Sequence, residues 1–241
     1  MSHSDERLVA LYDVGNTDGP DHDFYRSLAE QVSAGRIVDL GCGTGILTVT
    51  LAGAERTVLG VDPSAVMLRY AEARPGGDGM EWVLGDSRSV APVRADLVLM
   101  TGNVAMHVLG EDWLRTLADL HDCLVPGGTL VFETRTPAVR PWEHWVGSPS
   151  TRDTPAGRLT EWMEVVPPGP DGVLTYLAHN VFEATGEHLI ETQTLAFRAL
   201  DRVCQDLTEA GFAVHDTHGG WDSRPASDES PVFVLVARRS D

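Results

Sequence analysis

Three glycines at alternate positions form the most chemically informative stretch of this sequence. Gly41, Gly43 and Gly45 follow the apolar run 37–40 and precede a segment with helical patterning. Glycine lets a backbone approach a ligand closely, and the N–H groups at a helix start attract polar or anionic groups. The spacing therefore predicts a ligand-binding turn. A dinucleotide fingerprint would need a glycine at position 46, which is Ile46, so a nicotinamide cofactor is the disfavoured alternative.

Polar side chains end successive apolar runs of the same region. Asp39 closes the first run, Asp62 closes the second, Asp86 follows the third and Asn103 follows the fourth. A carboxylate in the position of Asp62 can accept both hydroxyls of an adenosine ribose, and one in the position of Asp86 can meet an adenine amino group. For Asp39, capping of the next helix is the alternative. Because parallel strands bind ligands at their carboxyl ends, we expect one shared site.

Histidines and tryptophans after these runs are candidates for chemistry on a second substrate. His107 comes shortly after Asn103, and a neutral imidazole is a suitable general base near neutral pH. His144 lies between Trp142 and Trp145, and an aromatic cluster can hold a flat or cationic molecule. The alternative for both histidines is a purely structural or solvent-facing role.

The elements that must position these residues alternate in type from residue 36 to 134. Strand-like apolar runs occupy 37–40, 57–61, 81–84, 97–100 and 129–132, and helical segments are expected over about 45–53, 64–74 and 111–124. Alternation of this kind predicts an α/β fold: a doubly wound, mostly parallel seven-stranded sheet with helices on both faces. A helix over about 200–210 and two closing strands, 212–214 and 232–236, complete it.

The pattern changes after Arg135. Residues 159–165, 173–178 and 189–195 alternate between apolar and polar, and turn residues separate them. This predicts an antiparallel β insertion after strand five, spanning 136–199 within a single domain 1–241. The insertion should lie over the carboxyl edge of the core as a lid and should form part of an acceptor pocket. The exposed face or edge of an added sheet is also a candidate homodimer surface.

Composition excludes several classes of function. The 241 residues carry a formal net charge of −18, and all 18 basic residues are arginine. Without lysine there is no Schiff-base chemistry with pyridoxal phosphate and no phosphate-loop lysine, and an acidic surface disfavours nucleic-acid partners. The widely spaced Cys42, Cys123 and Cys204 predict no zinc site or disulfide framework, and Cys42 is expected to be a small buried residue rather than a nucleophile. With no apolar signal core and no membrane span, we expect a soluble cytoplasmic protein.

The ordered motifs together resemble the class I S-adenosylmethionine-dependent methyltransferases. The matching stretches are Val38-Asp39-Leu40-Gly41-Cys42-Gly43-Thr44-Gly45, Gly60-Val61-Asp62-Pro63-Ser64, Gly85-Asp86 and Leu124-Val125-Pro126-Gly127-Gly128. The resemblance implies S-adenosylmethionine as cofactor, with Asp62 on the ribose and Asp86 near the adenine N6. It also implies Pro63 or Met67 against the adenine face, and Gly41 and Gly43 near the amino acid part.

An N-terminal Tyr12-Asp13 and a meander after strand five are similar to small-molecule N-methyltransferases of sugar-amine and glycine type. The full set of expected cofactor residues is Tyr12, Asp39, Gly41, Cys42, Gly43, Asp62, Pro63, Met67, Gly85, Asp86, Ser87, Thr101, Gly102 and Asn103. The expected acceptor pocket consists of Tyr25, His107, Arg135, Trp142 and His144, with His107 as the catalytic candidate. Tyr12 and Tyr25 could instead simply pack the N-terminal helices over the sheet.

The expected reaction is methyl transfer to nitrogen or oxygen of a small molecule, with a natural product or sugar amine as candidate acceptor. Alignment and exclusion of water do most of the work in such a displacement, so the absence of an obvious catalytic dyad does not count against it. Met100-Thr101-Gly102-Asn103 lacks an Asn-Pro-Pro-Tyr signature, which speaks against nucleobase and glutamine acceptors. The alternatives are a methyltransferase-like protein with a non-methylating reaction such as a cyclisation and, further off, a nicotinamide-dependent oxidoreductase.

Overall fold

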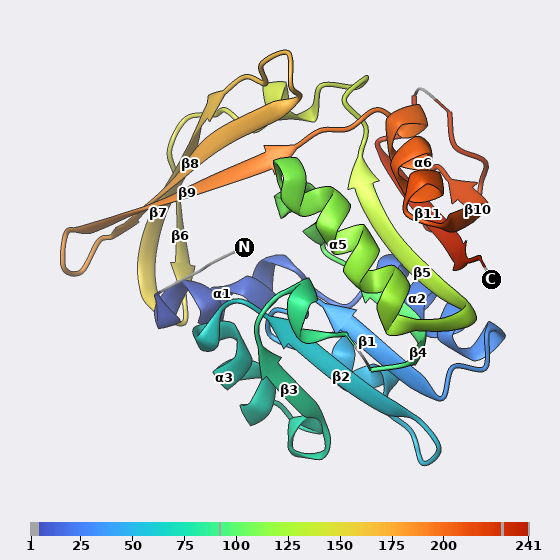
Figure 1. The fold of residues 1–241 in the computed structure, drawn as a ribbon. Coiled ribbons are helices and arrows are strands. Elements are labelled where there is room, and N and C mark those ends of the chain that lie inside the picture. Colours follow the sequence, from blue (N-terminus) through green and yellow to red (C-terminus); the bar gives the residue numbers. More distant parts are fainter. Residues whose placement is uncertain (1–4, 92, 228, 241) are drawn as a thin grey trace.

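A twisted seven-stranded sheet forms the centre of the protein (Figure 1). The computed structural model describes residues 5–91, 93–227 and 229–240. The strand order is β10-β11-β5-β4-β1-β2-β3, and β11 runs in the direction opposite to the other six strands. The bounds are β1 Arg36–Leu40, β2 Thr57–Asp62, β3 Glu81–Leu84, β4 Ala95–Met100, β5 Leu124–Arg135, β10 Phe212–His218 and β11 Val232–Arg239. The predicted α/β fold with a mostly parallel seven-stranded sheet is confirmed.

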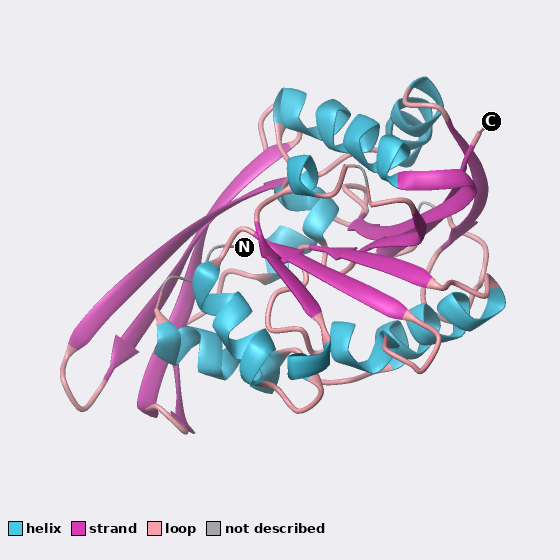
Figure 2. Ribbon diagram, turned by 60° about the horizontal axis from the view of Figure 1, so that its bottom comes forward, coloured by secondary structure: helices cyan, strands magenta, loops and turns pink. Residues whose placement is uncertain are grey.

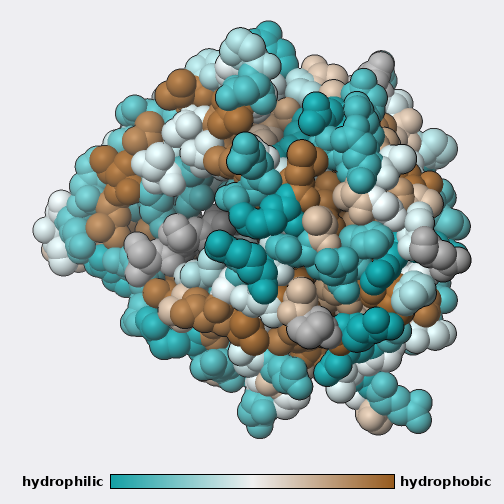
Figure 3. All heavy atoms as spheres, in the orientation of Figure 1, coloured by the Kyte–Doolittle hydropathy of each residue, from teal (hydrophilic) through white to brown (hydrophobic). Residues whose placement is uncertain are grey.

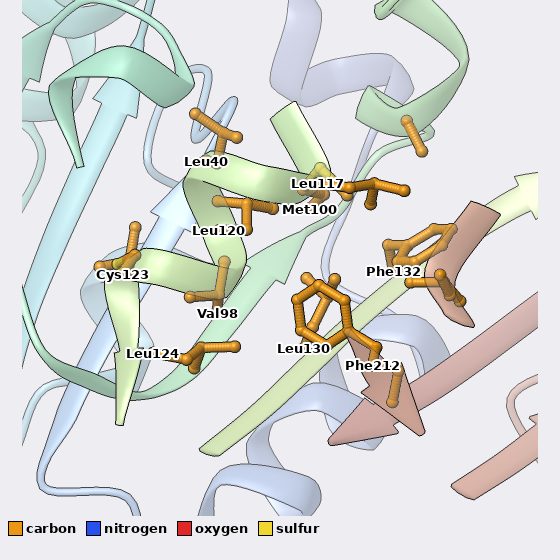
Figure 4. Close-up of a cluster of buried hydrophobic side chains, with 14 of the residues drawn as sticks. Leu40, Val98, Met100, Leu117, Leu120, Cys123, Leu124, Leu130, Phe132 and Phe212 are labelled. Atoms are coloured by element: carbon orange, nitrogen blue, oxygen red, sulfur yellow. The ribbon is translucent and has the colours of Figure 1, made fainter. Parts of the chain in front are cut away.

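Helices cover both faces of this sheet because each presents one apolar stripe (Figure 2). On one face, α5 (Gly110–Cys123) and α6 (Leu200–Glu209) bury their stripes against β4, β5 and β11. Figure 4 shows Leu117 and Leu120 of α5 against Val98, Met100 and Phe132 of the sheet. On the other face, α2 (Pro20–Gln31) packs Tyr25 and Ala29 over the central strands. The remaining helices are α1 Glu6–Gly15, α3 Ala65–Ala73 and α4 Val104–His107.

The insertion is a separate antiparallel sheet in the order β6-β7-β8-β9. Its strands are β6 Ser150–Thr154, β7 Gly157–Val166, β8 Val173–Phe182 and β9 Glu187–Ala196, and a 3-10 helix, η4 (Pro141–His144), precedes them. Figure 1 shows this sheet projecting from the core beside α1. Its alternate residues point to opposite sides, so one side chain in two faces α1 and the core.

One local expectation was wrong, and one strand was not expected. The helix expected over about 45–53 is only a 3-10 turn, Thr48–Leu51, and the three successive β-branched residues that begin this turn have low helix propensity. Strand β6 was not anticipated, since its residues are polar and mostly exposed. Among the described residues, no helix is long and apolar enough to cross a membrane.

Candidate active site

The glycine turn leaves β1 in the left-handed region of backbone space. Gly41, Gly43 and Gly45 have φ values of +77°, +55° and +71°, which side chains disfavour. A Cβ at Gly41 would lie 2.3 Å from Cγ2 of Val104, so the turn passes directly against the start of α4. At Gly43, by contrast, no heavy atom lies within 4 Å of that position. The turn is therefore tight on one side and open on the other.

Asp62, at the end of β2, is fixed by backbone donors. Its Oδ2 accepts from the N–H of Gly43 at 2.9 Å, and its Oδ1 accepts from the N–H of Ser64 at 2.8 Å. The side chain of Ser64 in turn caps α3 by accepting from the N–H of Met67 at 3.3 Å. Although Asp62 is only 5% exposed, each carboxylate oxygen carries more than one lone pair and can accept a further hydrogen bond. The result is an oriented carboxylate beside the glycine turn.

A first cavity of about 330 Å³ opens at the carboxyl ends of these strands, and we call it the cofactor cavity. The expected cofactor residues that line it are Tyr12, Gly41, Gly43, Asp62, Pro63, Met67, Asp86, Ser87, Thr101 and Gly102. Val108 and Leu109 add apolar surface. An adenosyl group needs an apolar slot for its base and a carboxylate for its ribose, and a charged amino acid end needs open backbone N–H groups. The lining offers the apolar slot and the carboxylate, so the residues present fit the adenosyl part of S-adenosylmethionine, while the N–H groups of Gly41 and Gly43 already donate to the Val61 carbonyl and to Asp62.

Four expected cofactor residues lie outside this lining. Asp39 is 1% exposed behind the turn, where it accepts from the Thr48 hydroxyl at 2.6 Å, and burial raises its pKa to about 6. Cys42 is buried, and burial raises the pKa of its thiol, as expected for a packing residue. Gly85 continues the ladder with an N–H bond to the Asp62 carbonyl at 3.0 Å. Asn103 faces the other cavity described below. These four residues do not line the cofactor cavity, and their assignment to the cofactor stays a prediction.

Asp86 is less open than the sequence suggests. Arg88 holds its carboxylate in a paired arrangement through Nε and the terminal nitrogen, and this hydrogen bonding lowers the pKa of Asp86. The next residue, Ser87, lines the cavity while its hydroxyl donates to Asp119 of α5 at 2.6 Å. Any group that meets Asp86 must therefore share its carboxylate with Arg88.

A second cavity of about 520 Å³ lies between α1, the core and the insertion, and we call it the acceptor cavity. Its wall includes one face of the insertion: Glu161, Met163, Tyr176, Ala178, Asn180, Glu191, Gln193 and Leu195. Three described residues, Tyr12, Gly102 and His107, line both cavities. The two cavities therefore meet at one shared wall.

The expected acceptor residues divide into two groups. His107 and Arg135 line the acceptor cavity, but Tyr25, Trp142 and His144 do not. Tyr25 is buried under the sheet by the apolar face of α2, and His144 is exposed on η4. Trp142 packs into the base of the insertion against Phe197, with ring centroids 4.7 Å apart, because its neighbours there are all apolar. These three residues do not line the acceptor cavity, and their assignment to an acceptor site stays a prediction.

Sequence reasoning missed the polar residues on the inner face of the insertion. Tyr176, Asn180, Glu191 and Gln193 face the cavity, and Trp145 replaces Trp142 in its wall. Burial raises the pKa of Tyr176, and the charge of Glu191 adds to this rise while that of Arg135 opposes it. Strict alternation along β8 and β9 was the available signal, but it does not reveal which face lies inward.

Helix α1 is tied to the glycine turn by Asp13 and Arg74. Asp13 accepts from the Thr44 hydroxyl at 2.6 Å and forms an ion pair with Arg74. Arg74 also donates from Nε to the Thr44 carbonyl at 2.9 Å. This cluster holds Tyr12 over both cavities, and burial raises the pKa of Tyr12 to about 12. The Tyr12 hydroxyl is therefore neutral at physiological pH.

Arg198, which follows the last strand of the insertion, holds helix α4, and this helix carries His107. Arg198 donates to the carbonyls of Ala105, at 3.0 Å, and Val108. Its guanidinium lies 4.4 Å from the ring centroid of Trp113, and burial lowers its pKa to about 10. Arg198 comes just after β9, so the end of the insertion is bonded to the segment that presents His107.

The family model and the curated relatives that match this sequence are all methyltransferases. The sequence model of the methyltransferase-domain family matches residues 37–128. An uncharacterised methyltransferase of Mycobacterium bovis is 33% identical over 105 residues, which are 43% of this chain and 53% of that protein. The chain thus spans about half the length of the curated relatives that it matches.

Solved structures share the fold over nearly the whole chain. The CcbJ methyltransferase of Streptomyces caelestis has a TM-score of 0.80 at 21% identity and covers 97% of this chain and 96% of its own. The sugar N-methyltransferase KedS8 of a Streptoalloteichus species has a TM-score of 0.76 at 18% identity and covers 100% and 94%. At these identities the likeness concerns the fold.

Proposed function

We propose, from the premise that this chain belongs to the class I S-adenosylmethionine-dependent methyltransferase family, that it methylates nitrogen or oxygen of a small molecule held in the acceptor cavity. The observation that carries this proposal is the wall shared by the two cavities, formed by Tyr12, Gly102 and His107. A donor in one cavity and an acceptor in the other would meet there.

The residues of the shared wall do mainly geometric work in this proposal. When bound, S-adenosylmethionine supplies an electrophilic methyl group on a positively charged sulfur. Tyr12 and Gly102 fix the line along which an acceptor atom approaches, and α1 and the insertion exclude water from that line. His107 is half-buried at the same wall and takes the proton of an acceptor hydroxyl. A neutral amine acceptor needs no such base.

The acceptor cavity combines a largely apolar lining with several polar side chains, which favours a small molecule that carries both apolar and polar groups. Amide side chains of Asn103, Asn180 and Gln193 and the hydroxyl of Tyr176 face a space of about 520 Å³, which lies within the range of small-molecule sites. Hydroxyl and amine groups of an amino sugar would satisfy such donors and acceptors. A solved neighbour named as a sugar N-methyltransferase supports the same class.

Binding and turnover test the proposal together. We expect calorimetry to show binding of S-adenosylhomocysteine and none of NAD, and labelled S-adenosylmethionine to transfer its methyl group to a member of a panel of amino sugars and hydroxylated natural products. Asp62→Ala should weaken S-adenosylhomocysteine about ten- to a hundredfold, since a hydrogen bond to a charged group contributes roughly 1.5–3 kcal/mol.

Asp78→Ala is the matched control, because Asp78 is exposed on a surface 3-10 turn. Unchanged affinity in Asp62→Ala would contradict the ribose assignment. Binding of S-adenosylhomocysteine without transfer to any acceptor, together with conversion of a substrate in another way, would favour the non-methylating alternative. Tight binding of NAD would favour the oxidoreductase.

A further inference from the structure

We propose that Glu133 is a positioning residue whose buried carboxylate holds loop 101–103 in the shape that both cavities need, and that this hold weakens when the carboxyl takes up a proton. The inference rests on the proposed function in so far as that loop borders the two ligands. Glu133 belongs to no motif recognised in the sequence and lines neither cavity.

Each oxygen of this carboxylate has its own donor. Oε1 of Glu133 accepts from the backbone N–H of Asn103, and Oε2 accepts from the hydroxyl of Tyr25. Glu133 is 3% exposed on β5, and Tyr25 is 1% exposed on α2. The carboxylate is therefore a bridge, inside the protein, between a helix on one face of the sheet and the loop at its carboxyl edge.

The loop that receives this bond has an unusual backbone. Gly102 and Asn103 are both left-handed, with φ values of +67° and +63°. Asn103 tolerates this region better than most residues, but a non-glycine residue there persists only when its surroundings hold it. The Asn103 carbonyl then accepts from the Met106 N–H at 2.9 Å, at the start of the helix that carries His107. A change at Asn103 would therefore reach both cavities and His107.

Opposing influences set the pKa of Glu133 close to neutral pH. Burial raises its pKa to about 7, while the hydrogen bonds from Tyr25 and Asn103 pull it down. On the neighbouring strand β11 the residue opposite Glu133 is the apolar Val234. The titratable groups that act on this pair from α2, α1 and β1 are Asp21, Tyr12 and Asp39.

Protonation changes the bond that holds the loop without removing it. The ionised carboxylate gives Asn103 a charge-assisted hydrogen bond, which is roughly twice as strong as a neutral one. A proton on Oε2 would reverse the bond to Tyr25, whose oxygen would then accept, and would leave Asn103 with a neutral partner. Glu133→Gln is the permanent form of that neutral state, because its amide can accept from Asn103 and donate to Tyr25.

The experiment follows the loop directly and then the ligand. In the ligand-free protein, the amide resonance of Asn103 in nitrogen-15 NMR should shift with pH around a midpoint near 7, and Glu133→Gln should remove this titration. Tyr25→Phe should move the midpoint upward, because the carboxylate loses a donor. Glu143→Gln, on the exposed surface of η4, is the matched control and should leave the titration as it is.

Affinity for S-adenosylhomocysteine, measured from pH 5.5 to 8.5, should rise about five- to tenfold with pH in the wild type, from the difference between charged and neutral hydrogen bonds. In Glu133→Gln this rise should be absent or smaller, and the difference between the two curves isolates Glu133 from Asp39, which titrates in both. A flat Asn103 resonance in the wild type, or the same affinity curve in both proteins, would overturn the inference. No binding at any pH with a titrating resonance would instead reject the proposed function alone.

Discussion

Single residues decide the chemistry where the two cavities meet. Tyr12, Gly102 and His107 come from α1, the loop after β4 and α4, and they form the shared wall although they are up to 95 positions apart in the sequence. Of the three, only His107 changes its charge near neutral pH in ordinary circumstances. It is therefore the one residue of the wall that can move a proton in the proposed reaction.

His107→Ala should separate base catalysis from positioning. With a hydroxyl acceptor, we expect single-turnover methyl transfer to slow by roughly two to four orders of magnitude, because general-base catalysis contributes about that much, while affinity for S-adenosylhomocysteine stays nearly constant. With an amine acceptor the loss should be small. His144→Ala is the control, since His144 is exposed outside both cavities. A loss below about tenfold with a hydroxyl acceptor would remove His107 from the catalytic role.

At the scale of elements, α1 and the insertion close the site from the same side. Arg7 of α1 pairs with Glu187 at the start of β9 at 2.8 Å, and its guanidinium lies 3.9 Å from the ring centroid of Phe182. At its other end, α1 is bound to the glycine turn through Asp13. The helix thus connects the insertion to the cofactor cavity, and its attachment should set how long ligands stay.

Asp13→Ala tests this attachment. It removes the acceptor for Thr44 and the partner of Arg74, so α1 should open more often, and S-adenosylhomocysteine should dissociate roughly five- to thirtyfold faster if about 1–2 kcal/mol is lost. Hydrogen exchange should rise in α1 and stay unchanged in α5. Asp18→Ala provides the control, because the Asp18 side chain contacts Arg26 and His22 of α2 and not the glycine turn. Equal dissociation rates in the two variants would show that Asp13 does not hold the helix over the ligand.

At the scale of the whole molecule, charge is the dominant feature. The net charge is −18, and Figure 3 shows a mostly hydrophilic face with hydrophobic side chains gathered over the projecting sheet at the upper left. Two of the acids, Asp39 and Glu133, are buried, and burial disfavours their charged forms. It raises the pKa of Asp39 to about 6 and that of Glu133 to about 7. The homodimer predicted from the added sheet stays a prediction.

These acids give the stability a definite dependence on pH. A carboxyl whose pKa is higher in the folded than in the unfolded protein stabilises the fold fully below its unfolded pKa, and this contribution is lost as pH rises through the folded value. We therefore expect the melting temperature to fall between about pH 4.5 and 7.5 and to recover partly with salt, which screens the repulsion.

Asp39→Asn should reduce this fall in melting temperature while it keeps the hydrogen bond from Thr48. At pH 8 we expect the free energy of unfolding to increase by on the order of 2 kcal/mol and the melting temperature by about 5 °C. Asp78→Asn, at an exposed position, should follow the wild type. A melting temperature that rises steadily from pH 5 to 8 would show that neither acid is destabilised by burial. Scanning calorimetry at several pH values measures both proteins.

The core fold and most residues that line the cofactor cavity could be predicted from the sequence alone. Gly41, Gly43 and Asp62 lie next to strand ends, and strand ends follow from apolar runs that local patterning reveals. Because parallel strands place their carboxyl ends at one edge, residues found one by one along the chain converge without further information. Ten of the fourteen residues expected at the cofactor line that cavity for this reason.

The residues that line the acceptor cavity, and the contacts that support the site, could be identified only from the three-dimensional packing. Alternation along β8 and β9 could not show which face would turn inward, so Tyr176 and Gln193 were missed, while Trp142 packs into the insertion instead. Asp13, Glu133 and Arg198 act on residues 31, 30 and 93 positions away. Such partners are chosen by packing in three dimensions, for which neither residue type nor spacing along a single chain carries a signal.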